Sequence, residues 1–238
     1  MPAYYTNTAR AFLHASSDEV LGALSRASRH EITPEQGRAW AEEINILKAA
    51  LASVIQKQAS AREWGVLLEF PLLRLGRRLD AVVLAGSAVC VLEFKVGATS
   101  ADAASRRQVE DYAADLRYFH APTRILPVFS AVCATGMQAA QLRPSISVEE
   151  VARAQALAPN QVAEFLLQAR ESAKSPEQIS VHDWNAGAYR PVPTIIQAAS
   201  MIYVQNSVAE IRTALSSHAN LTATVDRRAS KMNPDAAM

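Results

Sequence analysis

The chain has 238 residues, of which 50% are hydrophobic and 20% are charged, as in an ordinary globular protein with one good-sized domain, or with one domain plus an appendage. Its 24 basic and 23 acidic side chains leave a net charge of +1, which excludes a general electrostatic attraction to nucleic acid, so such a partner would need a local basic patch. No apolar stretch approaches membrane-spanning length and no signal peptide begins the chain, so we expect a cytoplasmic protein without membrane contact. Cys90 and Cys133 lie in apolar runs, which predicts buried free thiols.

The first part of the chain is predicted to be helical. Residues 1–32 form a helical segment, with a helix over Ser17–Ser28. A longer helix is predicted from Pro34 to Lys57, because Thr33 is a suitable N-cap and Pro34 fits the first helical position. Its apolar residues recur at helical spacing and define a buried stripe: Trp40, Ile44, Leu47, Leu51 and Val54. Glu43 is placed at the edge of this stripe.

Three strands are predicted next. The first covers Trp64–Leu75, where Pro71 indicates an edge strand or a bulge. Two further apolar runs form a hairpin around Gly86-Ser87: Leu79–Ala85 and Ala88–Val96. Because side chains alternate along a strand, Glu93 and Lys95 should project from the same face of the second hairpin strand.

The remaining elements are expected to be one strand and several helices. They are a helix over Ala103–Tyr118, a strand over Arg124–Ala134, and helices over Pro159–Ala173, Thr194–Val204 and Ser207–Ser216, with a loop around Asp183-Trp184-Asn185. Gln108 and Tyr112 are four residues apart, so they share one helix face. We expect domain boundaries that separate a core over residues 33–135, a helical extension over 136–225 and a polar tail or linker over 226–238.

Three charged side chains, Asp80, Glu93 and Lys95, lie inside the apolar hairpin. A buried carboxylate is costly unless it is paired, hydrogen-bonded or bound to a metal. A buried ion pair without chemistry would explain any one of them, but the three together favour a metal site. Mg²⁺ takes oxygen ligands and is usually held by one or two carboxylates with water and phosphate, so Asp80 and Glu93 are the predicted ligands, helped by the Phe94 carbonyl. Lys95 would orient or help deprotonate the attacking water.

These residues resemble the signature of the PD-(D/E)xK nuclease superfamily. The matching stretches are Gly76-Arg-Arg-Leu-Asp80 and Leu92-Glu-Phe-Lys95, with Leu79 at the position of the proline in the superfamily name. Gln108-x-x-x-Tyr112 resembles the QxxxY motif of RecB-type members, in which the Gln and Tyr contact DNA or brace the site. Glu43 matches the position at which many members carry an additional acidic residue.

The resemblance covers roughly residues 33–135 and implies both a fold and an activity. The implied fold is α/β with a restriction-endonuclease-like core, a mixed four-stranded sheet flanked by helices in the order αβββαβ. The implied activity is Mg²⁺- or Mn²⁺-dependent hydrolysis of DNA, with RNA as the other substrate. Two alternatives stay open: a weakly active or inactive module of the same fold that binds nucleic acid or docks a partner, and a purely structural or oligomerisation domain. A homodimer is compatible with the sequence.

Longer stretches resemble an uncharacterised bacterial domain that precedes a Schlafen-related P-loop helicase module. They are residues 68–71, 92–98, Gln108 with Tyr112, 189–197 and 220–222. The sequence has no G-x-x-x-x-G-K-[ST] motif, so the chain is either an N-terminal portion or a stand-alone homologue. The resemblance implies a P-loop helicase module as partner, in cis or in trans.

A group of arginines lies near the predicted site in sequence: Arg74, Arg77, Arg78, Arg106 and Arg107. They would form a local phosphate-binding patch or a solvated surface, and Arg77 and Arg78 are the predicted substrate-binding members. Glu69 could be a further acidic ligand, but an ion pair with Arg74 or Arg77 is favoured. The five histidines have no ligand spacing, so no zinc site is predicted.

Overall fold

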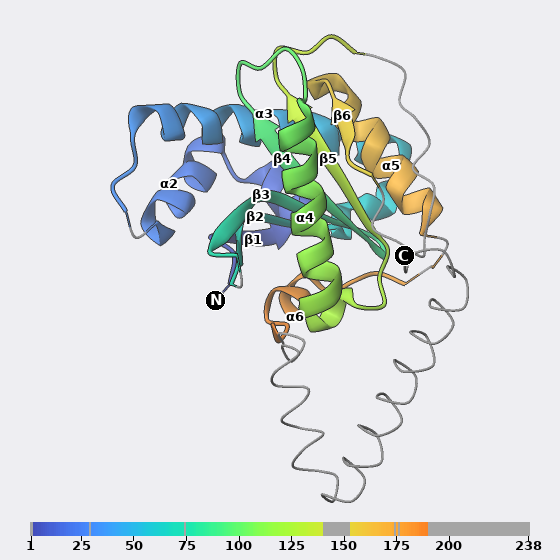
Figure 1. Ribbon diagram of the computed structural model, residues 1–238. Helices are drawn as coiled ribbons and strands as arrows, with labels where there is room; N and C mark the ends of the chain where they lie inside the picture. Colours follow the sequence, from blue (N-terminus) through green and yellow to red (C-terminus); the bar gives the residue numbers. More distant parts are fainter. Residues whose placement is uncertain are drawn as a thin grey trace, which may run out of the picture. The chain divides into compact units, whose positions relative to one another are not determined.

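The computed structural model describes residues 2–28, 30–73, 75–139, 153–173, 175 and 177–189. They form a mixed α/β fold in which one six-stranded sheet, in the spatial order β1-β2-β3-β4-β5-β6, is flanked by helices (Figure 1). The strands are β1 (Tyr5–Thr8), β2 (Gly65–Leu72), β3 (Arg77–Ala85), β4 (Ala88–Lys95), β5 (Val128–Ala134) and β6 (Gln155–Leu157). The sheet is antiparallel from β1 to β4 and parallel from β4 to β6.

The α-helices are α1 (Ala9–His14), α2 (Ser17–Ala27), α3 (Pro34–Lys57), α4 (Ala103–Phe119), α5 (Val162–Ser172) and α6 (Val181–Asn185). Short 3₁₀ segments cover Ala59–Glu63, Ala121–Thr123 and Pro159–Gln161. Side-chain N-caps start the two helices that flank the site. Thr33 accepts from the Gln36 N–H at the start of α3, and Asp102 accepts from the Ser105 N–H at the start of α4. Among the described residues, no helix is both long and apolar enough to cross a membrane.

Two hydrophobic cores lie on the two faces of the sheet. One, the α3-side core, joins α1, α2, α3 and α5 to the sheet, and includes Leu47, Leu68 and Leu92. The other, the α4-side core, joins α4 and α6 to the opposite face and includes Leu79 and Leu116. Figure 1 shows α4 lying across this second face. Functional side chains can therefore reach the sheet from α3 on one side and from α4 on the other.

The central elements follow the predicted order, α3, then β2, β3 and β4, then α4 and β5. The hairpin turn is at Gly86-Ser87, as predicted, and Gly86 has a φ of 67°. Glycine adopts this positive φ without steric cost, and a Cβ at this position would lie 2.3 Å from Arg170 Nε, so a larger residue would also have to displace the Arg170 side chain. Cys90 and Cys133 are free and buried, as predicted.

The sheet has six strands instead of the expected four. β1 lies in the segment predicted to be wholly helical, and β6 lies in the predicted helical extension. Both are short and pair along the edges of neighbouring strands, so tertiary hydrogen bonding determines them. Residues 183–185, predicted as loop, belong to α6, which Ser180 caps. Arg74 and the predictions beyond residue 189, which are two helices and the tail, lie outside the described residues.

Candidate functional site

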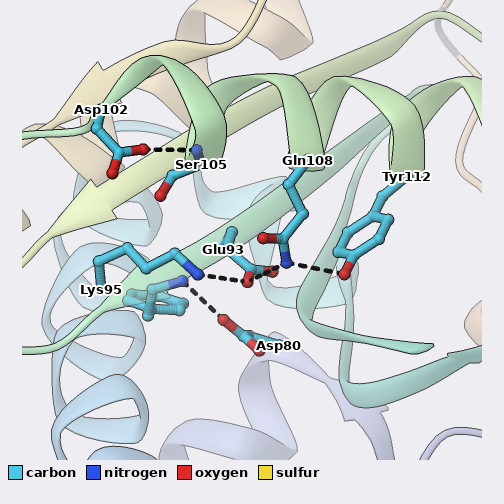
Figure 2. A network of polar contacts seen from close by, with 8 residues as sticks. Asp80, Glu93, Lys95, Asp102, Ser105, Gln108 and Tyr112 are labelled. Carbon is cyan, nitrogen blue, oxygen red and sulfur yellow. Dashed lines mark hydrogen bonds and ion pairs between the residues drawn. The ribbon is translucent and has the colours of Figure 1, made fainter.

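The candidate site lies at the open end of the β3–β4 hairpin. The backbone ladder between the two strands runs from Ala85↔Ala88 to Ala81↔Leu92. At the next position a side chain replaces the backbone carbonyl as hydrogen-bond acceptor: the Phe94 N–H donates to Asp80 Oδ2 at 2.7 Å (Figure 2). The Asp80 carboxylate therefore lies in the seam, the space between β3 and β4 just beyond the last ladder pair, where the backbone of β4 holds it.

Glu93 and Lys95 project together from β4, as the alternation of side chains predicts. Lys95 Nζ donates to Glu93 Oε1 at 3.0 Å. On α4, Gln108 Nε2 donates both to Glu93 Oε1 at 3.1 Å and to Tyr112 Oη at 2.8 Å. Figure 2 shows these four side chains converging with Asp80 between the strands and the helix. Predicted site residues from three elements are therefore brought together.

Most of the acidic groups here are withdrawn from solvent. Glu93 is 6% exposed and Glu43, which faces inward from α3 as predicted, is 8% exposed. Asp80 is half-buried, and the Lys95 side chain is 32% exposed. Within the described part of the chain, Glu93 Oε2 is buried and has no hydrogen-bond partner. A buried carboxylate oxygen without a partner is costly, so this atom is suited to a ligand that the protein alone does not supply.

Burial and mutual repulsion raise the pKa values of these carboxyl groups. Burial raises the pKa of Glu43 to about 10, and the charges of Asp80, Glu69 and Glu93 add to the effect. Burial also raises the pKa of Asp80 well above its usual value, with Glu93 contributing and the Phe94 N–H opposing. The pKa of Glu93 is raised by burial against the attraction of Lys95. Such a group of carboxyl groups holds protons that a cation would displace.

Lys95 remains a cation. Burial alone would lower its pKa, but the attraction of Glu93, followed by that of Asp80, outweighs burial and raises it above 10.5. At neutral pH the ammonium group is charged, which suits it to binding a water molecule or a phosphate oxygen and not to accepting a proton.

Of the two arginines predicted to pair with Glu69, Arg74 lies outside the described residues, and Arg77 is not the partner that the structure shows. Glu69 Oε2 lies 3.3 Å from Arg78 Nε, and Oε1 accepts from Trp40 Nε1 at 2.8 Å. Trp40 was assigned only to the core, and the sequence offers no indication of this polar contact between α3 and β2. Arg78 also stacks on the Tyr4 ring, 4.5 Å from its centroid. It is therefore engaged on the β1 side of the site.

Two of the predicted arginines share a hollow next to the Gln108–Tyr112 pair. The hollow has a volume of about 550 Å³ and lies between the β2–β3 turn and α4. Its lining residues are Leu75, Arg77, Ala104, Arg107, Gln108, Asp111 and Tyr112. Arg77 and Arg107 are exposed, so the described part of the chain has a small basic hollow bordering the acidic site.

The residues present fit a hard divalent cation. The ligand set would be carboxylate oxygen, which Mg²⁺ and Mn²⁺ prefer, and the Glu93 Oε2 atom has no other partner among the described residues. As placed, no three Asp, Glu, His or Cys side chains in the described ranges are grouped closely enough to enclose an ion. A bound ion would therefore keep several waters, as Mg²⁺ commonly does.

Comparison of the chain with protein-family models, with curated proteins and with solved structures gave no match.

Proposed function

We propose that the protein is a metal-dependent nuclease that hydrolyses phosphodiester bonds of DNA, with RNA as the second substrate to test. The observation that supports this most is the convergence of Asp80, Glu93 and Lys95 at the open end of the β3–β4 hairpin. Two carboxylates beside one ammonium group combine a cation site with a donor for water or phosphate. A purely structural role gives no reason for concentrating buried charge at this point.

In this proposal Asp80 and Glu93 hold Mg²⁺ or Mn²⁺, with the Phe94 carbonyl as a further oxygen ligand. When bound, the ion would activate a water molecule and offset negative charge on the phosphate. Lys95 donates to the water or to a phosphate oxygen and stabilises the charge that develops there. Gln108 fixes the Glu93 carboxylate through Oε1 and leaves Oε2 available.

The other residues support the reaction from the two sides of the sheet. Glu43 is an accessory acid facing the seam from α3, and Tyr112 braces Gln108 from α4. Arg77 and Arg107 bind phosphates of the substrate in the hollow beside Gln108. Arg78, also a predicted substrate contact, is paired with Glu69.

The finer fold assignment and the cellular context belong to the same proposal. We propose that α3, β2, β3, β4, α4 and β5 correspond to a restriction-endonuclease-like core, with β1 and β6 added at the edges of its sheet. We further propose that a P-loop helicase module acts with this domain, in cis or in trans. Free buried thiols at Cys90 and Cys133 agree with a cytoplasmic location.

A second function, a binding module without turnover, is favoured by one observation. In the described residues, no three candidate ligands are grouped to enclose an ion, so the protein alone does not provide a closed cage for a metal. Such a module would still bind nucleic acid through Arg77 and Arg107.

A cleavage panel distinguishes the two functions. Labelled single- and double-stranded DNA and RNA are incubated with Mg²⁺ or Mn²⁺, alongside the Asp80→Asn variant, whose amide oxygen can still accept from Phe94. Cleavage by the wild type that Asp80→Asn lacks supports the nuclease. Equal cleavage by both, or salt-dependent binding without any cleavage or metal binding, would overturn it.

A further inference from the structure

Glu69 has an unusual backbone. It is the single non-glycine residue with a positive φ in the described part of the chain, with φ 53° inside β2. A left-handed conformation is disfavoured for residues that carry a Cβ, and such strain persists when the surrounding structure enforces it. The register of the neighbouring pairs places Glu69 opposite Asp80.

At this position the side chains of β2 and β3 switch from one face of the sheet to the other. Leu68 belongs to the α3-side core, whereas Phe70, two residues later, belongs to the α4-side core. On β3, Ala81 belongs to the α3-side core, whereas Leu79 belongs to the α4-side core. Residues two apart share a face in a regular strand, so the pleat of both strands reverses between the pair Leu68↔Ala81 and the pair Phe70↔Leu79.

β4 does not reverse. Leu92 and Phe94 both belong to the α3-side core, so the side chain between them, Glu93, faces α4 in the regular way. The reversal in β3 without one in β4 explains why the ladder between them stops at Ala81↔Leu92. It also explains why the Asp80 carboxylate, and not a backbone carbonyl, accepts from the Phe94 N–H.

The Glu69 side chain is held on both sides. Trp40 Nε1 donates to Oε1 at 2.8 Å, and Arg78 Nε lies 3.3 Å from Oε2. The Arg78 guanidinium is itself stacked on Tyr4. These contacts come from α3, β3 and the segment before β1, so they oppose a return of Glu69 to the extended conformation.

We propose that Glu69 is a positioning residue of the candidate site, whose left-handed backbone reverses the pleat of β2 and β3 and thereby places the Asp80 carboxylate in the seam beside Glu93. Its consequence for metal binding rests on the proposed function, but the placement of Asp80 does not. The backbone conformation carries this role, and the carboxylate serves to hold it.

Two variants that both lack the carboxylate test the role of the backbone. Glycine adopts a positive φ without steric cost, whereas β-branched valine strongly disfavours it, so Glu69→Gly and Glu69→Val differ in the property at issue. The first readout is the hydrogen-exchange rate of the Phe94 amide by NMR, which reports its bond to Asp80. The second is the Mn²⁺ dissociation constant from calorimetry. Circular dichroism establishes that each variant is folded.

We expect Glu69→Gly to lose less of the Phe94 amide protection and less of the Mn²⁺ affinity than Glu69→Val, because glycine permits the positive φ although it lacks the carboxylate that holds it. Glu69→Val should lose both, each by about tenfold or more, the change that follows from a loss of one typical hydrogen bond to a charged group. If Glu69→Val does not fold, Glu69→Ala takes its place, because alanine disfavours the left-handed region less strongly.

Retained protection in the valine or alanine variant would overturn the proposal, as would an equal loss in the glycine variant. If the wild type binds no Mn²⁺, the proposed metal site fails, but the exchange rate of the Phe94 amide still decides the role of Glu69.

Discussion

The two ends of the β3–β4 hairpin differ although they belong to the same pair of strands. At the turn end, a regular antiparallel ladder joins buried apolar residues from Ala81↔Leu92 to Ala85↔Ala88. At the open end the ladder stops, and Asp80 accepts from a backbone N–H that a regular ladder would pair with a carbonyl. The turn end follows from local sequence, whereas the open end depends on residues contributed by β2, α3 and α4.

The comparison indicates a division of roles along the hairpin. Apolar burial at the turn end stabilises the fold, because each side chain there removes apolar surface from water. At the open end, burial works against stability by raising the pKa values of Asp80, Glu93 and Glu43. Strain and unfavourable burial of charge commonly accompany functional sites, where stability is exchanged for reactivity.

The largest effect on stability is expected at the turn end. Leu84 is fully buried in the α4-side core, and Leu84→Ala should lower the free energy of unfolding by about 2–5 kcal/mol because it leaves a cavity. Mn²⁺ affinity of the folded variant should change by no more than about threefold, since the site lies at the other end of the hairpin. Urea denaturation and calorimetry measure the two quantities. A large loss of metal affinity would show that the two ends are not independent.

A substitution at the open end should reduce cleavage strongly and change the stability of the fold only slightly. Lys95→Ala should reduce Mg²⁺-dependent cleavage by about 100- to 1000-fold, the usual cost of removing one donor to developing charge. The free energy of unfolding should change less than in Leu84→Ala, because Lys95 is partly exposed and Gln108 still donates to Glu93. Lys57→Ala, at an exposed lysine near the end of α3, is the matched control and should cleave like the wild type. Undiminished cleavage by Lys95→Ala contradicts its assigned role.

Replacement of Glu43 should have a smaller effect on stability, and this effect should depend on pH. Its pKa is raised from 4.5 to about 10 in the folded protein, so between these values the folded chain holds a proton that the unfolded chain has lost. Its contribution to stability therefore falls as pH rises through this range. Glu43→Gln should stabilise the metal-free protein by about 0.5–2 kcal/mol at pH values near 9 and less near pH 5. Urea denaturation at both pH values tests this, and an equal effect at the two would contradict it.

The smallest effect is expected in the basic hollow beside the open end. Arg77→Ala and Arg107→Ala should each weaken oligonucleotide binding and reduce the slope of log affinity against log salt concentration by about one. Arg38→Ala, at an exposed arginine paired with Glu35, serves as control and should leave the slope unchanged. Fluorescence anisotropy titrations at several salt concentrations measure the slopes. Slopes equal to that of the wild type would exclude both arginines from the phosphate-binding surface.

The spacing of apolar residues along the chain was sufficient to predict the central helices and strands but not the edge strands of the sheet. The apolar stripe of α3 and the hairpin around Gly86 follow from local patterns, and the structure has both near their predicted bounds. β1 has the polar sequence Tyr-Thr-Asn-Thr, so its pairing with β2 has no local indication. The pairing of Glu69 with Arg78 and Trp40 was likewise not predictable, because it depends on a left-handed backbone at a residue that seldom adopts one.

The sequence by itself determined which side chains share a face. Strand alternation placed Glu93 beside Lys95, and the four-residue spacing placed Gln108 beside Tyr112, because both relations depend on the geometry of one element. The tertiary structure alone decided that Asp80 enters the seam, that Gln108 reaches Glu93 and that Glu43 is buried close enough to these carboxyl groups for their charges to raise its pKa. These relations depend on register, on the reversed pleat at Glu69 and on the packing of helices against the two faces of the sheet, none of which a local pattern specifies.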